Sequence, residues 1–347
     1  MLNVVEWTRL EPWRVARART DRDEPVIVKW MGPHAAATHS EGWRLRTEVA
    51  ALRFLAEDLG VCLAPRVLAE DLPGGRMVLE DLAPRTALDG LLRRDGAGAH
   101  AERLAAFARI RGELGALTAG HAETYYRRRS LVGPVDPAAD RLGRVHRLER
   151  VPHAEELGVP ISGGVARELG LARAELADPG PFLVLSNGDP EANNVLVHGS
   201  GPADARLIDF EFAGFTHALH DAVCLHVPGP AWLSVQPPGE VYRRALAAGV
   251  PAAEDERRYG LGLAAACVSW ALARLTRLPA LDARPAGDDS RAQLVATLEA
   301  AAGTADDHRS LPRLADLCRR LAAALRRRWP DADLDFTALP PYAPRRR

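Results

Sequence analysis

The sequence has almost no lysine and little asparagine. Of its 45 basic residues only Lys29 is lysine, and three of its four asparagines, Asn187, Asn193 and Asn194, fall within eight positions. The chain otherwise favours Ala, Arg, Gly and Pro, so residue types that it avoids elsewhere are candidates for a chemical role. Lys29 and the segment 187–194 are therefore the first places to expect a functional site.

The sequence also has few cysteines, a net charge close to zero and no long apolar run. The four cysteines show no C-x-x-C spacing, which predicts reduced thiols rather than a disulfide framework or a zinc site. A net charge of −1 offers no overall attraction to nucleic acid or an acidic membrane. The most apolar stretch, residues 261–272, is far below the roughly 20 residues that span a bilayer. With no signal-peptide pattern at the start, we expect a cytoplasmic protein without nucleic-acid or membrane partners.

Residues 1–83 predict a small, mainly antiparallel lobe. Two β-branched runs flank a polar turn and are typical of a hairpin, with Lys29 in the second strand. An amphipathic pattern closed by Gly60 indicates a helix, and this helix carries Glu48. Two further strands flank a Pro-Gly-Gly turn. The predicted elements are strands at 13–17, 25–31, 64–71 and 76–84 and a helix at 41–59.

Residues 84–347 predict a mainly helical second lobe with a small sheet inserted. The chain exceeds the roughly 100–200 residues of one domain, so two lobes are expected. Three strand-like runs, FLVL, NVLV and ARLIDF, lie within residues 182–214. We therefore expect an α+β protein. The predicted helices are 100–126, 163–177, 240–249, 253–277, 289–301 and 310–329, with 261–272 as a buried core segment.

The polar residues of the insert predict a magnesium and phosphate site. Asp189 lies on a loop after one strand, Asn194 lies five residues on, and Asp209 ends the third strand. Such oxygen donors suit Mg²⁺, which takes its remaining ligands from phosphates and water. Phosphoryl transfer also needs a cation on the phosphates. Lys29 is the expected cation, and Glu48 could pair with it.

Simpler interpretations exist for several of these residues. An isolated Asp-x-x-x-x-Asn is common by chance and is typical of Asx turns. Its combination with the LIDFE segment and the Lys–Glu pair favours a catalytic role for this motif. Asn193 is better explained as a turn residue, and Glu211 as a loop-bracing residue rather than a ligand of a second metal. His217, His220 and His226 lack the spacing of a zinc site.

These segments resemble the aminoglycoside phosphotransferase and choline kinase superfamily, the small-molecule branch of the protein-kinase-like fold. SNGDPEANNVLV stands where that family has its H-x-D-x-x-x-x-N catalytic loop, and LIDFEFAG stands at its metal-binding strand. The resemblance implies that Asp189 orients or deprotonates a hydroxyl. It implies that Asn194 and Asp209 bind Mg²⁺, and that Lys29, paired with Glu48, binds the phosphates of ATP.

The resemblance extends to the region between the lobes and shows two departures. MVLEDLA looks like the inter-lobe hinge, where backbone groups of Glu80 and Leu82 would hold adenine. Asp221 is similar to the family's aspartate that braces the catalytic loop. Asn187, however, replaces the family's usual histidine, and residues 7–13 contain no glycine for a phosphate loop.

The implied protein is bilobal and kinase-like, with a nucleotide-binding lobe at 1–83 and a helical lobe at 84–347. It would transfer the γ-phosphoryl of ATP to a hydroxyl of a small molecule such as an aminoglycoside antibiotic. A metabolic kinase for choline, a sugar or an amino-alcohol and a non-catalytic nucleotide-binding protein are the alternatives. About a dozen residues between Asp209 and Asp221 leave no room for a peptide-docking segment. Acids that could contact a cationic acceptor are Glu254, Asp255, Asp288 and Asp289.

Overall fold

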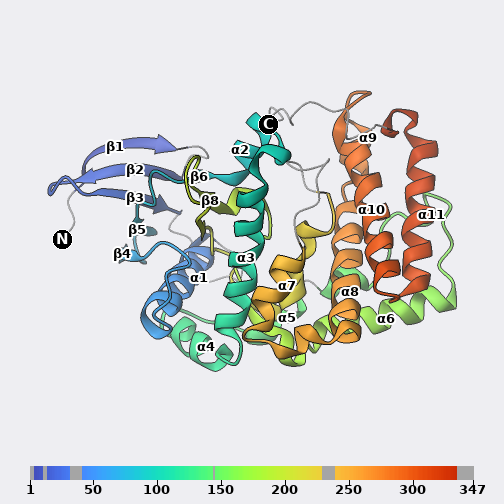
Figure 1. Ribbon diagram of the computed structural model, residues 1–347, viewed down its shortest axis with the longest axis horizontal. Helices are drawn as coiled ribbons and strands as arrows, with labels where there is room; N and C mark the ends of the chain where they lie inside the picture. Colours follow the sequence, from blue (N-terminus) through green and yellow to red (C-terminus); the bar gives the residue numbers. More distant parts are fainter. Residues whose placement is uncertain (1–3, 11–13, 32–40, 144, 229–238, 334–347) are drawn as a thin grey trace.

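The computed structural model describes residues 4–10, 14–31, 41–143, 145–228 and 239–333 (Figure 1). A five-stranded antiparallel sheet forms one end of an elongated molecule, and helices make up most of the remainder. The predicted α+β class is therefore confirmed. The predicted boundary at residue 83 falls where the chain passes from the last strand of this sheet to the helical part, and it stays a prediction.

The N-terminal sheet contains the predicted hairpin and the predicted strand pair. Its strand order is β1-β2-β3-β5-β4, with β2 and β3 forming the hairpin and Val15 opposite Lys29. Strand β1 was not predicted; Val5 and Trp7 alternate with Glu6 and Thr8, but all four residues are exposed, so this short alternation marks no buried face. Residues 11–13, within the glycine-free segment, lie outside the described residues. The strands are β1 (Val4–Leu10), β2 (Val15–Thr20), β3 (Pro25–Trp30), β4 (Val67–Asp71) and β5 (Arg76–Glu80).

The predicted helix of this lobe is α1 (Glu41–Arg53), extended by a π-helical turn, η1 (Phe54–Asp58). It ends where expected, since Gly60 adopts a φ of +65°, a conformation that glycine accepts readily. The helix packs against β4 and β5. The apolar positions that predicted this helix are all buried: Leu45, Val49, Leu52 and Leu55.

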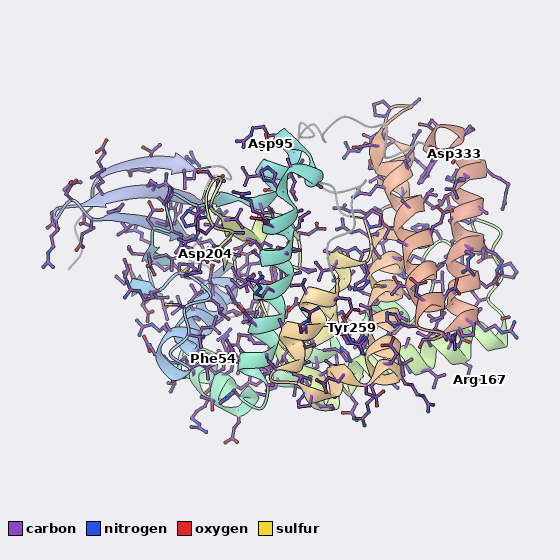
Figure 2. The ribbon with its side chains drawn as sticks, viewed as in Figure 1. Phe54, Asp95, Arg167, Asp204, Tyr259 and Asp333 are labelled. Carbon is purple, nitrogen blue, oxygen red and sulfur yellow. The ribbon has the colours of Figure 1, made fainter. Side chains whose placement is uncertain are left out.

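A shared core joins the sheet end to the helical part. Phe54, labelled in Figure 2, packs edge-on against Tyr125 of α4 (Ala122–Leu131), with ring centroids 5.6 Å apart. It also packs against Phe215, at 6.3 Å. The backbone N–H of Leu207 donates to the carbonyl of Leu63 at 2.8 Å. These contacts fix the two parts of the molecule against each other.

Two small sheets carry the polar segment. The three predicted runs are all strands, but the first pairs with an unpredicted strand, while the second and third form the expected hairpin. The loop before the second run and the loop after the third run therefore each connect the two different sheets. One sheet contains β7 (Leu183–Ser186) and β10 (Gly214–His217); the other contains β6 (Thr86–Ala87), β8 (Val195–Val197) and β9 (Ala205–Leu207).

Helices form the rest of the fold, with α3 between the sheet end and a bundle in which α10 contacts both α8 and α11 (Figure 1). The predicted helix 100–126 is wrong as one element, because the chain leaves the helix near Gly120, whose φ is +79°. The predicted buried segment 261–272 lies in α8 and is almost wholly buried. None of the helices in the described ranges combines the length and apolar character needed to cross a membrane. The remaining helices are α2 (Leu88–Asp95), α3 (Ala101–Thr118), α5 (Pro137–Leu142), α6 (Gly163–Ala177), α7 (Gly239–Ala247), α8 (Glu256–Leu275), α9 (Leu278–Asp282), α10 (Asp289–Asp307) and α11 (Pro312–Arg328).

Candidate active site

Three predicted site residues from distant parts of the chain meet in one cluster. Lys29 Nζ on β3 lies 2.6 Å from Glu48 Oε2 on α1 and 2.7 Å from Asp209 Oδ1 after β9. The side chains of Lys29 and Glu48 are 13% and 2% exposed. Burial alone lowers the pKa of Lys29, but the two carboxylates outweigh it and raise the pKa above its ordinary value. Lys29 is therefore a fixed cation in this cluster.

The segment around Asp209 is shaped by backbone contacts. Asp209 has a φ of +63°, an uncommon conformation for a residue with a side chain. The backbone N–H of the next residue, Phe210, donates to Glu48 Oε1 at 3.4 Å. Glu48 thus contacts both Lys29 and the backbone beside Asp209, which fixes the direction of the lysine towards this loop.

Asp189 lies on a tight loop after β7. Gly188 has a φ of +95°, and a Cβ placed there would lie 2.4 Å from the Phe212 Cβ, so only glycine fits. Asp189 Oδ1 accepts the backbone N–H of Glu191 at 3.2 Å, which closes an Asx-type turn. The Asp189 side chain is partly exposed. Its carboxylate is therefore held by local structure while remaining accessible.

Asn194 connects the Asp189 loop to the Asp209 segment. Its Nδ2 lies 3.5 Å from the carbonyl oxygen of Asp189, at the limit of a hydrogen bond. Its own carbonyl accepts the backbone N–H of Ile208 at 3.0 Å, so Asn194 is bonded to the residue before Asp209. Asn193, expected to be a turn residue, is exposed in a 3-10 turn and donates to Asn194 Oδ1 at 2.9 Å.

The donor set in this region fits a hard divalent cation. Within the described residues, no group of three or more His, Cys, Asp or Glu side chains is placed to hold a metal ion. A magnesium site here would use the amide oxygen of Asn194 and the carboxylate of Asp209, with phosphate and water supplying the remaining ligands. The Asp209 side chain is 37% exposed, which leaves it accessible to such an ion.

Glu211 lies at the edge of this cluster. The sequence allowed two roles for it, bracing the loop or binding a second metal ion. Burial raises the pKa of its carboxyl to about 7, and the charge of Asp209 adds to the shift. Arg44 Nη1 lies 3.7 Å from Glu211 Oε1, and the Arg44 guanidinium stacks over the Phe212 ring. These contacts are consistent with a bracing role between α1 and the loop after β9.

The predicted hinge follows β5. The backbone N–H of Glu80 donates to the carbonyl of Arg66 at 3.0 Å, so an adenine contact at Glu80 would use its carbonyl oxygen. Leu82 is buried, and its carbonyl accepts the N–H of Arg85 at 3.1 Å. Asp81, between them, accepts from Arg17 Nε at 2.7 Å. The roles of Glu80 and Leu82 stay predictions.

The acids that were expected to meet a cationic acceptor are divided between two places. Asp255 caps α8, and Asp288 caps α10 by accepting the N–H of Ser290. Glu254 and Asp289 flank them. Because α8 has 20 residues, it is about 30 Å long. The α9–α10 connection follows its far end (Figure 1), so the two pairs of acids cannot both contact one small acceptor.

Three functional candidates were missed in the sequence. Arg111 on α3 is fully buried, and its guanidinium donates to the carbonyl oxygens of Asp189 and Glu191 at 3.0 and 3.3 Å. The carboxylate of Glu191 accepts from Arg274 of α8 at 2.5 Å, and Arg274 stacks over Trp270. Burial raises the pKa of the Glu191 carboxyl, although Arg274 opposes the shift. The position of Glu191 inside the predicted catalytic loop was a signal that could have identified it.

The fold is two-lobed and protein-kinase-like. It combines an antiparallel sheet with a helical remainder, and a buried Lys29–Glu48 pair faces Asp209. The chain belongs to the phosphotransferase enzyme family, whose model matches residues 43–261. No curated protein matches the sequence. The family and the fold confirm the resemblance stated from the sequence.

Among the solved structures similar to this chain, one with a TM-score above 0.5 supports the fold. An ethanolamine kinase from Plasmodium vivax is 10% identical and has a TM-score of 0.51 over 94% of this chain and 83% of that one. A choline/ethanolamine kinase family protein from Mesorhizobium loti is 22% identical, with a TM-score of 0.47 over 93% of each chain. An aminoglycoside phosphotransferase from Alicyclobacillus acidocaldarius is 13% identical, with a TM-score of 0.44 over 94% and 93%. At 10% identity, the likeness to the ethanolamine kinase shows a shared fold and not a shared acceptor.

Proposed function

We propose that this protein transfers the γ-phosphoryl group of ATP, in the presence of Mg²⁺, to a hydroxyl of a small molecule. The observation that carries the proposal is the pair of contacts made by Lys29, 2.6 Å to Glu48 and 2.7 Å to Asp209. A buried lysine fixed between two carboxylates, one of them partly exposed beside a polar loop, is a ready cation for phosphate oxygens. Membership of the phosphotransferase enzyme family supports this interpretation.

Each predicted residue has a part in this proposal. Lys29, oriented by Glu48, would bind phosphate oxygens of ATP, and Asn194 with Asp209 would hold the metal. Bound Mg²⁺ would neutralise charge on the phosphates. The backbone at Glu80 and Leu82 would hold adenine. Asp189, fixed by its turn and partly exposed, would accept a hydrogen bond from the acceptor hydroxyl and orient it or take its proton.

A small acceptor fits the segment that follows the metal site better than a protein acceptor does. Residues 213–220 are all buried, and residues 214–217 form β10, which pairs with β7. A strand inside the core presents no exposed segment on which a peptide substrate could dock. We propose hydroxylated antibiotics of the aminoglycoside type as the first acceptor class. Choline, sugars and amino-alcohols form the second acceptor class.

An ATP-consumption screen tests the proposal. The purified protein with ATP and Mg²⁺ should form ADP only when an acceptor from the panel of aminoglycosides, other hydroxylated antibiotics, choline and sugars is present. Asp189→Ala should lower turnover at least on the order of a hundredfold, as expected when a general base is lost. The affinity for ATP should change by less than about threefold, because Asp189 acts on the acceptor and not on the nucleotide.

Asp316→Ala is the matched control, since Asp316 is an exposed carboxylate on α11 that pairs with Arg320. This variant should keep wild-type turnover. If the wild type binds ATP but phosphorylates no acceptor of the panel, a non-catalytic nucleotide-binding role replaces the proposed one. If Asp189→Ala retains full turnover, the assignment of Asp189 fails while the activity itself stands.

A further inference from the structure

Arg111 is a buried arginine whose place in the fold calls for an explanation. It lies on α3, the helix between the sheet end and the C-terminal bundle (Figure 1), and its side chain is fully buried. Removing a charged guanidinium from water is expensive unless close partners compensate. A purely structural position in a helix core could hold leucine or methionine instead. The partners of Arg111 therefore indicate what it does.

The polar partners of Arg111 lie in or next to the Asp189 loop. Its guanidinium donates to the carbonyl oxygens of Asp189 and Glu191 at 3.0 and 3.3 Å and to Asn187 Oδ1 at 3.1 Å. Its charge is balanced by Asp221, whose Oδ1 lies 3.7 Å away and is itself buried. One planar group with a fixed fork of donors thus holds both sides of the Asp189 turn.

Asn187 extends this contact to the metal-binding segment. While its Oδ1 accepts from Arg111, its Nδ2 donates to the carbonyl oxygen of Ile208 at 3.1 Å. Ile208 immediately precedes Asp209. A continuous set of hydrogen bonds, which we call the Arg111–Asn187 link, therefore runs from α3 through the Asp189 loop to the Asp209 segment. Asn187, which replaces the family's usual histidine, thus makes two of the hydrogen bonds of this link.

We propose that Arg111, acting through Asn187, is a positioning residue that sets the spacing between Asp189 and Asp209. This inference rests on the proposed function. Arg111 contacts the carbonyl oxygens at the two ends of the Asp189–Glu191 turn and is itself fully buried, so it acts on the reaction only through the geometry of other groups. A displacement of about 1 Å at a reacting group can lower a rate on the order of a hundredfold.

Arg111→Met is the main test variant, since methionine fills much of the volume without donors or charge. We expect kcat to fall on the order of ten- to a hundredfold with the Kd for ATP within about threefold of wild type. Deuterium uptake should rise in peptides that cover residues 187–195 and 206–211. Arg111→Lys should lie between wild type and Arg111→Met, because one ammonium keeps the charge but cannot make all three bonds.

Arg291→Met provides the matched control. Arg291 on α10 is also buried, and it donates to the carbonyl oxygens of Leu281 and Arg284 at 3.0 and 2.7 Å while pairing with Asp331. Its loss should destabilise the fold in the same way, yet leave kcat and deuterium uptake at 187–195 unchanged. Measurements are made below the unfolding transition of every variant.

The outcomes separate this inference from the proposed function. An Arg111→Met protein with kcat within threefold of wild type and unchanged uptake at 187–195 and 206–211 contradicts the inference, as does an equal loss of kcat in Arg291→Met. If Arg111→Met does not fold, Arg111→Lys and Asn187→Ala are measured against the same criteria. If the wild type itself shows no phosphoryl transfer, the proposed function fails, and deuterium uptake alone still decides whether the Arg111–Asn187 link holds the two loops.

Discussion

Replacing Lys29 by methionine should destabilise the folded protein by leaving a buried carboxylate without its cation. Lys29 Nζ lies 2.6 Å from Glu48, whose side chain is 2% exposed, and 2.7 Å from Asp209, which is 37% exposed. Breaking a buried ion pair by removing one partner costs about 3–5 kcal/mol. Water reaches Asp209 and screens its interaction with Lys29. We therefore expect Lys29→Met to lower the free energy of unfolding by about 3 kcal/mol at pH 8, towards the lower end of that range.

The size of this loss should depend on pH. Burial raises the pKa of the Glu48 carboxyl, and in the wild type Lys29 opposes this shift. Without Lys29 the pKa of Glu48 rises further, so the folded variant binds a proton that the unfolded chain releases near its ordinary pKa. A carboxyl with a raised folded-state pKa loses stability as the pH rises through that pKa. The deficit of Lys29→Met should therefore be smaller at pH 5 than at pH 8.

Urea unfolding followed by tryptophan fluorescence, between pH 5 and pH 8, measures these differences. The double variant Lys29→Met/Glu48→Gln should recover at least about 1 kcal/mol relative to Lys29→Met, because no buried charge is left unpaired. Arg19→Met is the control, since the Arg19–Asp23 pair is exposed and its loss should change the free energy of unfolding far less. A Lys29→Met protein within about 0.5 kcal/mol of wild type at pH 8, or a deficit independent of pH, would refute the reasoning.

Two further predictions concern the Asp189 loop and the half-buried His226. Gly188→Ala should lower stability by about 2–4 kcal/mol and reduce turnover, because the new Cβ meets Phe212, whereas Gly60→Ala, with open space around it, should cost about 1 kcal/mol. Burial lowers the pKa of His226 to about 4, so the unfolded chain takes up this proton first and stability falls as the pH drops from about 6.5 towards 4. Thermal melts across this range should show His226→Gln removing about 2–3 kcal/mol of that loss; an unchanged acid slope in His226→Gln contradicts the assignment.

The elements that carry the site were predictable because their signals are local. The strand with Lys29 is a β-branched run that follows a polar turn, and the helix with Glu48 repeats its apolar residues at helical spacing. The loop around Asp189 is marked by glycine, proline and clustered asparagines in a chain that otherwise avoids asparagine. In each case the residues that decide the structure are neighbours in the sequence, so composition and spacing were sufficient.

The residues that hold the site together were not predictable, because their contacts cross long stretches of chain. Arg111 bonds to Asn187 across 76 positions, and Arg274 bonds to Glu191 across 83. Among so many arginines, nothing local distinguishes these two. Strand β1 was missed for a different reason: residues 5–8 are exposed, so the strand forms through backbone pairing with β2, and the short alternation of Val5 and Trp7 with polar residues marks no buried face.

The most direct test of the central claim is a crystal structure with Mn²⁺, as an anomalous-scattering substitute for Mg²⁺, and a non-hydrolysable ATP analogue. We predict one ion bound by oxygens of Asp209 and Asn194 at about 2.1 Å. Lys29 Nζ should lie within hydrogen-bonding distance of a phosphate oxygen, and the Asp189 carboxylate should face the γ-phosphate. A nucleotide bound away from β3, or an anomalous peak that neither Asp209 nor Asn194 contacts, would contradict the account.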